Sequence, residues 1–178
     1  LLLLKKDKVG ARREYERAIK LDPHSVDALA GMTSLDISEG QLAKARARLD
    51  AELAAAEKLD GKWSQPIVQR GWAAYQESRI APNVDPSLIP ALVQKGIEHA
   101  ERALAIAPGD ADALELRGTL RYWGWLRSIA PDPAAMKTLV DGAADDLMAA
   151  TKANPMQAGA WNILSHYWLR KATPSQAK

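Results

Sequence analysis

The side chains best able to do chemistry in this chain are histidines and carboxylates, and they lie far apart. His24, His99 and His166 form no pair at i, i+4 with a carboxylate, so a metal site would need distant segments to converge. Positions on the surface or between helices explain the histidines better. A small acidic group at 141–146 fits a solvated helix face without a catalytic role. We therefore predict no metal site and no cofactor.

Nucleophilic chemistry finds no support in the sequence either. The chain contains no cysteine, which removes disulfides, thiolate zinc sites and cysteine nucleophiles. It also lacks a nucleophile motif and a glycine-rich phosphate loop. We expect no catalytic residues and a protein that is not an enzyme. The compartment stays open, with the cytoplasm slightly favoured over the periplasm.

The charge balance argues against a polyanionic partner. The 178 residues include 24 basic and 22 acidic side chains, a net charge of +2, so no nucleic acid is expected. Positions 1–20 form a mild basic patch, which a solvated helix face explains, with contact to nucleic acid or an acidic partner as the minority interpretation. The opening run 1–4 of leucines is too short for a signal core and fits the tail of a helix, so no membrane segment is predicted.

The elements that position these side chains are predicted to be closely packed helices. Alanine and leucine dominate the apolar residues, and phenylalanine is absent; this composition favours helix-on-helix packing. The sequence also repeats itself at a spacing of 47 residues. The pairs that share this spacing include Gly71 and Gly118, Tyr75 and Tyr122, Pro86 and Pro133, and Pro108 and Pro155.

This spacing predicts one domain, 1–178, built from successive two-helix units. Full units at 62–108 and 109–155 follow a shorter unit at 24–61, with partial units at 1–23 and 156–178. The missing initiating methionine and the absence of a helix stop at the end predict a piece of a longer protein.

Helix starts and stops have local causes. Asp85 and Asp132 can cap free backbone N–H groups, and each precedes a proline that fits the first helical turn. Ala107 and Asn154 precede prolines that push them out of helical geometry. The predicted helices are 9–21, 25–38, 41–59, 64–80, 86–106, 111–128, 133–153 and 157–171.

Three stretches of sequence carry a family resemblance. Residues 10–23 read G-A-R-R-E-Y-E-R-A-I-K-L-D-P, residues 101–108 read E-R-A-L-A-I-A-P, and residues 158–168 read A-G-A-W-N-I-L-S-H-Y-W. Their small and aromatic positions resemble those of the tetratricopeptide repeat (TPR) family, over essentially the whole chain. The resemblance implies an all-α fold, a right-handed α-α superhelix of antiparallel helical hairpins. The family unit has roughly 34 residues, so extra residues are expected near 79–85 and 126–132, where they lengthen the hairpins or contact a partner.

The same resemblance implies where a partner binds. In this family the first helix of each hairpin lines the concave surface, and aromatic residues with polar neighbours suit a peptide or partner helix. Some of the aromatic residues could instead be core. The inward candidates are Gln65, Val68, Trp72, Tyr75, Gln76, Asp112, Glu115, Thr119, Tyr122, Trp123, Asn162, His166, Leu169 and Arg170.

The expected function is therefore a non-catalytic protein-protein interaction module that binds a protein or peptide on an aromatic-lined concave face. The alternative is a regulatory or dimerising helical-repeat arm of a larger enzyme or signalling protein. End-to-end self-association is also possible, because hairpins without outer neighbours expose apolar surface at Leu1 to Leu4 and at Trp161 to Trp168.

Overall fold

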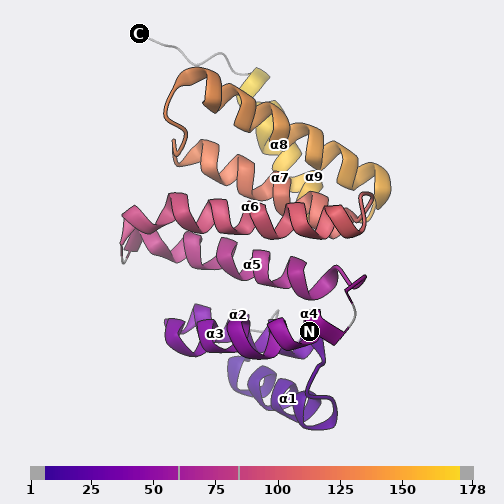
Figure 1. The fold of residues 1–178 in the computed structure, drawn as a ribbon. Helices are drawn as coiled ribbons and strands as arrows, with labels where there is room; N and C mark the ends of the chain where they lie inside the picture. Colours follow the sequence, from indigo (N-terminus) through magenta and orange to yellow (C-terminus); the bar gives the residue numbers. More distant parts are fainter. Residues whose placement is uncertain (1–6, 60, 84, 173–178) are drawn as a thin grey trace.

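The computed structural model describes residues 7–59, 61–83 and 85–172; helices joined by short loops make up this part of the chain, with no strand among these residues (Figure 1). The expected apolar surface at Leu1 to Leu4 lies outside this part of the chain. The α-helices are α1 (Lys8–Leu21), α2 (Val26–Ser38), α3 (Leu42–Arg48), α4 (Ala54–Leu59), α5 (Gln65–Ile80), α6 (Ile89–Ile106), α7 (Ala111–Leu126), α8 (Pro133–Ala153) and α9 (Ala158–Ala172). Three short elements are η1 (Leu49–Leu53), η2 (Ala81–Asn83) and η3 (Pro86–Leu88).

The helix ends follow the capping residues. The Asp132 side chain accepts a hydrogen bond from the backbone N–H of Ala135, and Pro133 occupies the first turn of α8. Asp110 caps α7 by accepting from the N–H groups of Asp112 and Ala113. Asp85 caps the short 3₁₀ turn η3, after which α6 begins. The predicted helix boundaries lie within about three residues of the observed ones.

One predicted helix is not regular. The segment predicted as a single helix over 41–59 contains the π-helical turn η1 between α3 and α4. Ala45, Leu49, Leu53 and Ala56 are all buried, and they recur mostly every four residues, which is longer than one α-helical turn. The wider π turn keeps these side chains on one face, against the second apolar cluster of the core.

The hairpins stack one after another along the molecule, from α1 at one end to α8 and α9 at the other (Figure 1). We call α2, α5, α7 and α9 the first-helix row, since they are the first helices of their hairpins. This row is continuous, because α2 contacts α5, α5 contacts α7 and α7 contacts α9. The second-helix row consists of α1, α3 with α4, α6 and α8, and each member packs on neighbouring members of the first row.

Small residues let the helices of a hairpin approach closely. A Cβ atom at Gly71 would lie 3.3 Å from the carbonyl oxygen of Gly96, and one at Gly118 would lie 3.0 Å from that of Ala143. Each glycine also meets a leucine, Leu116 for Gly71 and Leu147 for Gly118. The backbone pair of the second crossing, Gly118 and Ala143, lies 47 positions after that of the first. The division of the chain into units of that length stays a prediction.

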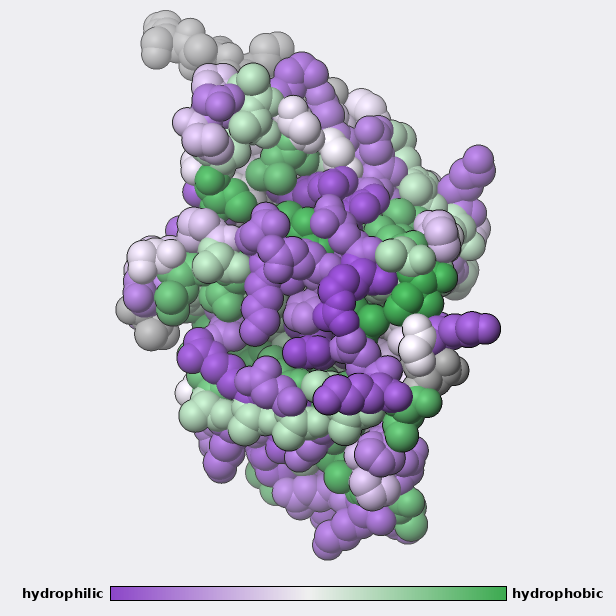
Figure 2. Space-filling model, in the orientation of Figure 1, coloured by the Kyte–Doolittle hydropathy of each residue, from purple (hydrophilic) through white to green (hydrophobic). Residues whose placement is uncertain are grey.

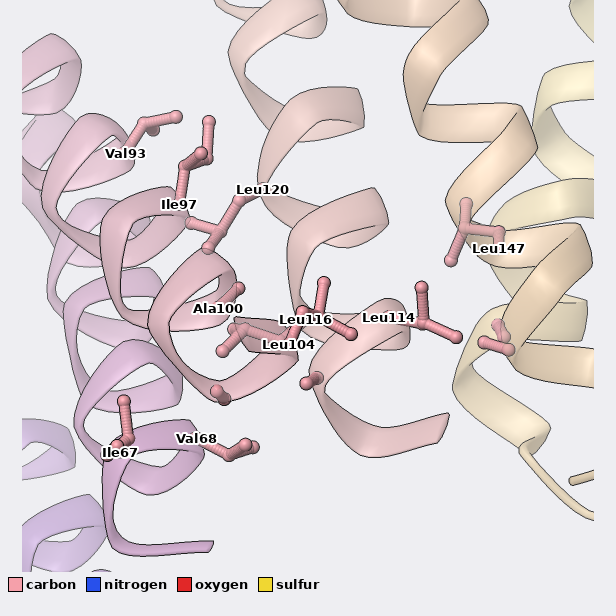
Figure 3. Packing of buried hydrophobic residues seen from close by; sticks show 14 of the residues in the cluster. Ile67, Val68, Val93, Ile97, Ala100, Leu104, Leu114, Leu116, Leu120 and Leu147 are labelled. Atoms are coloured by element: carbon pink, nitrogen blue, oxygen red, sulfur yellow. The ribbon is translucent and has the colours of Figure 1, made fainter. Parts of the chain in front are cut away.

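The largest apolar cluster joins two hairpins. Figure 3 shows Leu116 and Leu120 of α7 beside Leu104 and Ile97 of α6, whereas Leu114 points to the other side, towards α8 and α9. Leu116, Leu120 and Leu147 have no exposed surface. Because each hairpin covers the apolar side of its neighbour, the fold is the predicted all-α stack of helical hairpins.

One carboxylate departs from the expectation of a solvated acidic face. Asp146 of α8 is buried, and it accepts hydrogen bonds from Arg117 Nη2 and Arg121 Nη1, each at 2.6 Å. These guanidinium groups come from α7, so the pairing ties the two helices of one hairpin together. A buried charge requires such partners, and Asp146 therefore has a structural role.

Candidate partner-binding face

The predicted contact residues lie along the first-helix row, but not all of them reach the surface. Gln65, Trp72, Tyr75 and Gln76 of α5 are partly exposed, as are Asp112, Glu115 and Trp123 of α7. On α9, the predicted residues Asn162, His166, Leu169 and Arg170 are all exposed. The row thus presents a mixed surface of amide, carboxylate and aromatic groups.

Three of the predicted contact residues belong to the core instead. Val68 has no exposed surface and packs in the largest apolar cluster, and Thr119 is only 3% exposed. Tyr122 is 7% exposed and packs with Ala143 and Tyr167. Each first helix contacts a second helix and also the next first helix, so positions that face inward on one helix are covered by its neighbour. These side chains are not available to a partner.

The helices of the row all begin at one edge of it, which we call its N-terminal end, and polar side chains bind one another there. Gln65 Nε2 donates to Asp112 Oδ2 at 3.0 Å, and Gln157 Nε2 donates to Asp112 Oδ1 at 2.6 Å. Burial, and then the nearby charge of Asp112, raises the pKa of Glu115, which lies one turn further along α7. A groove of about 500 Å³ opens beside these residues, with Asp22 and Asp27 also in its lining. This end of the row is acidic.

The helices of the row end at its opposite edge, which we call its C-terminal end, and arginine side chains lie over aromatic rings there. Tyr75 and Trp72 contact edge to face, with their centroids 5.7 Å apart. Arg79 donates from Nη1 to the Tyr75 hydroxyl at 3.0 Å, and its guanidinium lies 5.4 Å from the Trp123 ring centroid. Arg127 lies 5.5 Å from the same centroid. Similarly, Arg170 of α9 lies 5.8 Å from the Trp125 ring. This end is basic and aromatic.

A groove of about 410 Å³ lies between α2 and α5 at this basic end. Gln76 Nε2 donates to Ser34 Oγ at 3.0 Å across the groove, and Lys8 Nζ donates to Ser38 Oγ at 3.0 Å. The residues that line it are Lys8, Ser34, Leu35, Ile37, Ser38, Tyr75, Gln76, Arg79 and Ile80.

Only Tyr75 and Gln76 of this groove were predicted from the sequence. Arg79 and Ile80 follow them by four residues each, so helical spacing could have extended the predicted face by one turn. The α2 residues and Lys8 could not be found in that way. They meet α5 only through the packing of one hairpin on the next.

The face in Figure 2 is largely hydrophilic along its middle, with hydrophobic residues in separate patches. Among the residues that the structure describes, no group of three or more histidine or acidic side chains is arranged to hold a metal ion. In the same part of the chain, no helix combines the length and the apolar character needed to cross a membrane.

Neither a model of a known protein family nor a curated protein matches the sequence, but solved structures match the fold. The crystal structure of MamA shares 19% sequence identity with a TM-score of 0.50, over 96% of this chain and 82% of MamA. A thermophilic TPR protein from Thermus thermophilus shares 15% identity with a TM-score of 0.52, over 94% of both chains. The chain therefore has a TPR-like helical repeat fold, a right-handed α-α superhelix.

Proposed function

We propose that this protein is a non-catalytic interaction module that binds a peptide or protein segment on its first-helix row. The TPR-like fold supports a protein-interaction repeat module in general, because such arrays present extended binding surfaces. One observation supports the finer proposal. The groove between α2 and α5 opens on the row at Tyr75 and Gln76, beside the ring of Trp72. Aromatic rings with polar neighbours give large contact area at small entropic cost.

The non-catalytic part of the proposal is supported by the separation of the titratable groups. Burial lowers the pKa of His99 on α6 and raises that of Glu115 on α7. Burial opposes the ionisation of Asp36 on α2, but hydrogen bonds from Arg48 and Arg12 outweigh it and lower the pKa. None of these three groups contributes to the pKa shift of another, and local packing accounts for each of them, whereas an acid-base site would bring them together.

Affinity capture from the source cell tests the proposal. Tyr75→Ala and Gln76→Ala change the rim of the groove, and Gln94→Ala with Glu98→Ala is the matched control on exposed positions of α6. We expect the first pair to reduce the recovered partner several-fold and the control to leave it unchanged. Circular dichroism verifies that each variant keeps its helicity. Equal recovery with both pairs would exclude the rim of the groove at Tyr75 and Gln76 as the binding surface.

A second candidate function is a dimerising arm of a larger protein. It is favoured by the apolar surface of α9, where Met156, just before the helix, is 85% exposed and Trp161 is 53% exposed. Large apolar residues exposed at the end of a repeat array often mark a surface that a partner protein covers. Sedimentation at increasing protein concentration distinguishes this function from that of a monomeric module.

A further inference from the structure

We propose that the groove between α2 and α5, with the basic end of the first-helix row, selects an acidic peptide segment that also carries apolar side chains. This inference rests on the proposed function and adds the chemistry of the partner. It follows from the lining of the groove, from the pairing of the arginines and from the charge at the other end of the row.

The floor of the groove is apolar. Leu35, Ile37 and Ile80 line it together with the Tyr75 ring, and the polar groups of Ser34 and Gln76 are bound to each other. Its volume of about 410 Å³ is within the range of sites that enclose small ligands. Apolar side chains of a peptide would bury their surface there, at roughly 25 cal/mol per Å² removed from water.

The charged groups of the groove have one sign. Its lining contains Lys8 and Arg79 but no acidic residue. Both cations donate to neutral oxygens, Lys8 to the Ser38 hydroxyl and Arg79 to the Tyr75 hydroxyl. In the described part of the chain, neither makes an ion pair with a carboxylate. Their charges are therefore available to an acidic partner.

Six arginines elsewhere in the fold are neutralised by buried or partly buried carboxylates. Arg12 and Arg48 pair with Asp36, Arg70 and Arg102 pair with Glu57, and Arg117 and Arg121 pair with Asp146. At the basic end of the row, Arg79, Arg127 and Arg170 instead lie over aromatic rings. Arg79 uses Nη1 on the Tyr75 hydroxyl, and the remaining N–H groups of a guanidinium that lies over a ring can bind a carboxylate.

The helix dipole does not explain this charge pattern by itself. Basic side chains at the C-terminal ends of α5 and α7 offset the partial negative charge there. Lys8, however, is the first residue of α1, where the dipole disfavours a cation. The Asp7 carboxylate at the N-cap of α1 already offsets part of this effect, and an anionic group bound in the groove would favour the lysine further.

The carboxylates at the acidic end of the row limit the length of the acidic peptide that can bind. Asp27 and Asp112 line the groove at the N-terminal end, with Glu115 one turn away. A long polyanion lying along the row would meet these carboxylates, whereas a short peptide at the basic end would not. The net charge of +2 also gives no broad basic surface for nucleic acid.

Selection from a random peptide-display library tests the inference while the natural partner is still unidentified. We expect enriched peptides to combine aspartate or glutamate with apolar residues. The selected peptides, resynthesised with a fluorescent label, are then titrated by anisotropy. Binding should weaken as salt rises, because exposed charges are screened.

Two variants locate the binding. Arg79→Glu reverses the charge, and Ser38→Trp places a large side chain in the groove; each should raise the Kd of the selected peptides about tenfold or more. Arg13→Glu makes the same charge change on α1, where the Arg13 side chain is 77% exposed and lies outside the groove. That control should change the Kd less than about twofold, and circular dichroism confirms folding of all three proteins.

The outcomes separate the two proposals. A library that yields no enriched peptide contradicts the proposed function itself. Enriched peptides without acidic residues, or with a Kd insensitive to both Arg79→Glu and Ser38→Trp, overturn only the acidic-partner inference. Binding of a single-stranded oligonucleotide that Arg79→Glu abolishes, without enrichment of acidic peptides, would also overturn it.

Discussion

His99 is a buried base whose neighbours disfavour its charge. It is 7% exposed on α6. The small groove beside it is lined by the basic residues Arg46, Arg70 and Lys95 and also by the acidic residues Asp50 and Glu77. Burial, followed by the charges of Arg70, Arg102 and Lys95, lowers its pKa from 6.5 to about 4, against the opposite effect of Glu57. Folding therefore holds this imidazole neutral.

This pKa shift makes stability depend on pH. Between about 6.5 and 4 the unfolded chain binds a proton at His99 that the folded chain does not, so stability is complete above this window and falls as the pH decreases through it. The limiting loss is about 3 kcal/mol. Denaturant unfolding of the wild type and His99→Gln at several pH values measures it, and the variant should show a shallower decrease between pH 6.5 and 5. His24→Gln, on an exposed histidine, is the control; equal slopes for wild type and His99→Gln would exclude His99 as the cause.

At the residue scale, the sequence predicted which side chains lie on the first helices, but not which of them are buried by a neighbouring helix. Trp72, Tyr75 and Trp123 were predicted as contact residues and are partly exposed, but Tyr122 directly precedes Trp123 and is buried. Periodicity places such neighbours on adjacent parts of one helix. Which of them is covered depends on where the next helix crosses, and that is a tertiary property.

Helix crossings are the decisive feature at the element scale. Gly118 lies where α7 meets α8, and a Cβ there would be 2.6 Å from Leu147 Cγ and 3.0 Å from the Ala143 carbonyl oxygen. Since a backbone atom cannot move as a flexible side chain can, added volume must push the two helices apart. The hairpin depends on the absence of a side chain at this position.

Replacing Gly118 by leucine should therefore destabilise the protein. We expect a loss of about 1–3 kcal/mol from overpacking, which corresponds to a decrease in Tm of roughly 2–12 °C for a domain of this size. Thermal unfolding followed by circular dichroism measures it. Gly109→Leu is the matched control, because nothing lies within 4 Å of a Cβ at Gly109. If both variants melted like the wild type, the assigned crossing would be wrong.

Element boundaries were predictable because their causes are local. Asp132 with Pro133 marks the start of α8 in the sequence, and the carboxylate caps that helix in the structure. The π turn η1 was not predicted, since its cause is the shared burial of Leu49 and Leu53 against α2 and α5. The groove between α2 and α5 was missed for a similar reason, because it belongs to two hairpins at once.

On the scale of the whole molecule, the stack has two different ends. At one end, Met156 and Trp161 are exposed at α9; at the other, Val9 is 83% and Leu21 is 82% exposed on α1 (Figure 1). A repeat array exposes such surface wherever a unit lacks a neighbour. Two modes of association follow from this. Contact of α9 with α9 closes a symmetric dimer, whereas contact of α9 with α1 is head-to-tail and can continue into longer chains.

Variants at the two ends distinguish these modes. We expect the average mass in sedimentation equilibrium to rise above that of the monomer as concentration increases, and Trp161→Gln with Met156→Gln to abolish the rise, because about half or more of each wild-type side chain is exposed. Val9→Gln with Leu21→Gln should prevent association only if it is head-to-tail. Leu88→Gln, at a 39% exposed site between α5 and α6, controls for a general loss of surface hydrophobicity. A wild type that stays monomeric at every concentration would contradict both modes and leave α9 to contact a different protein.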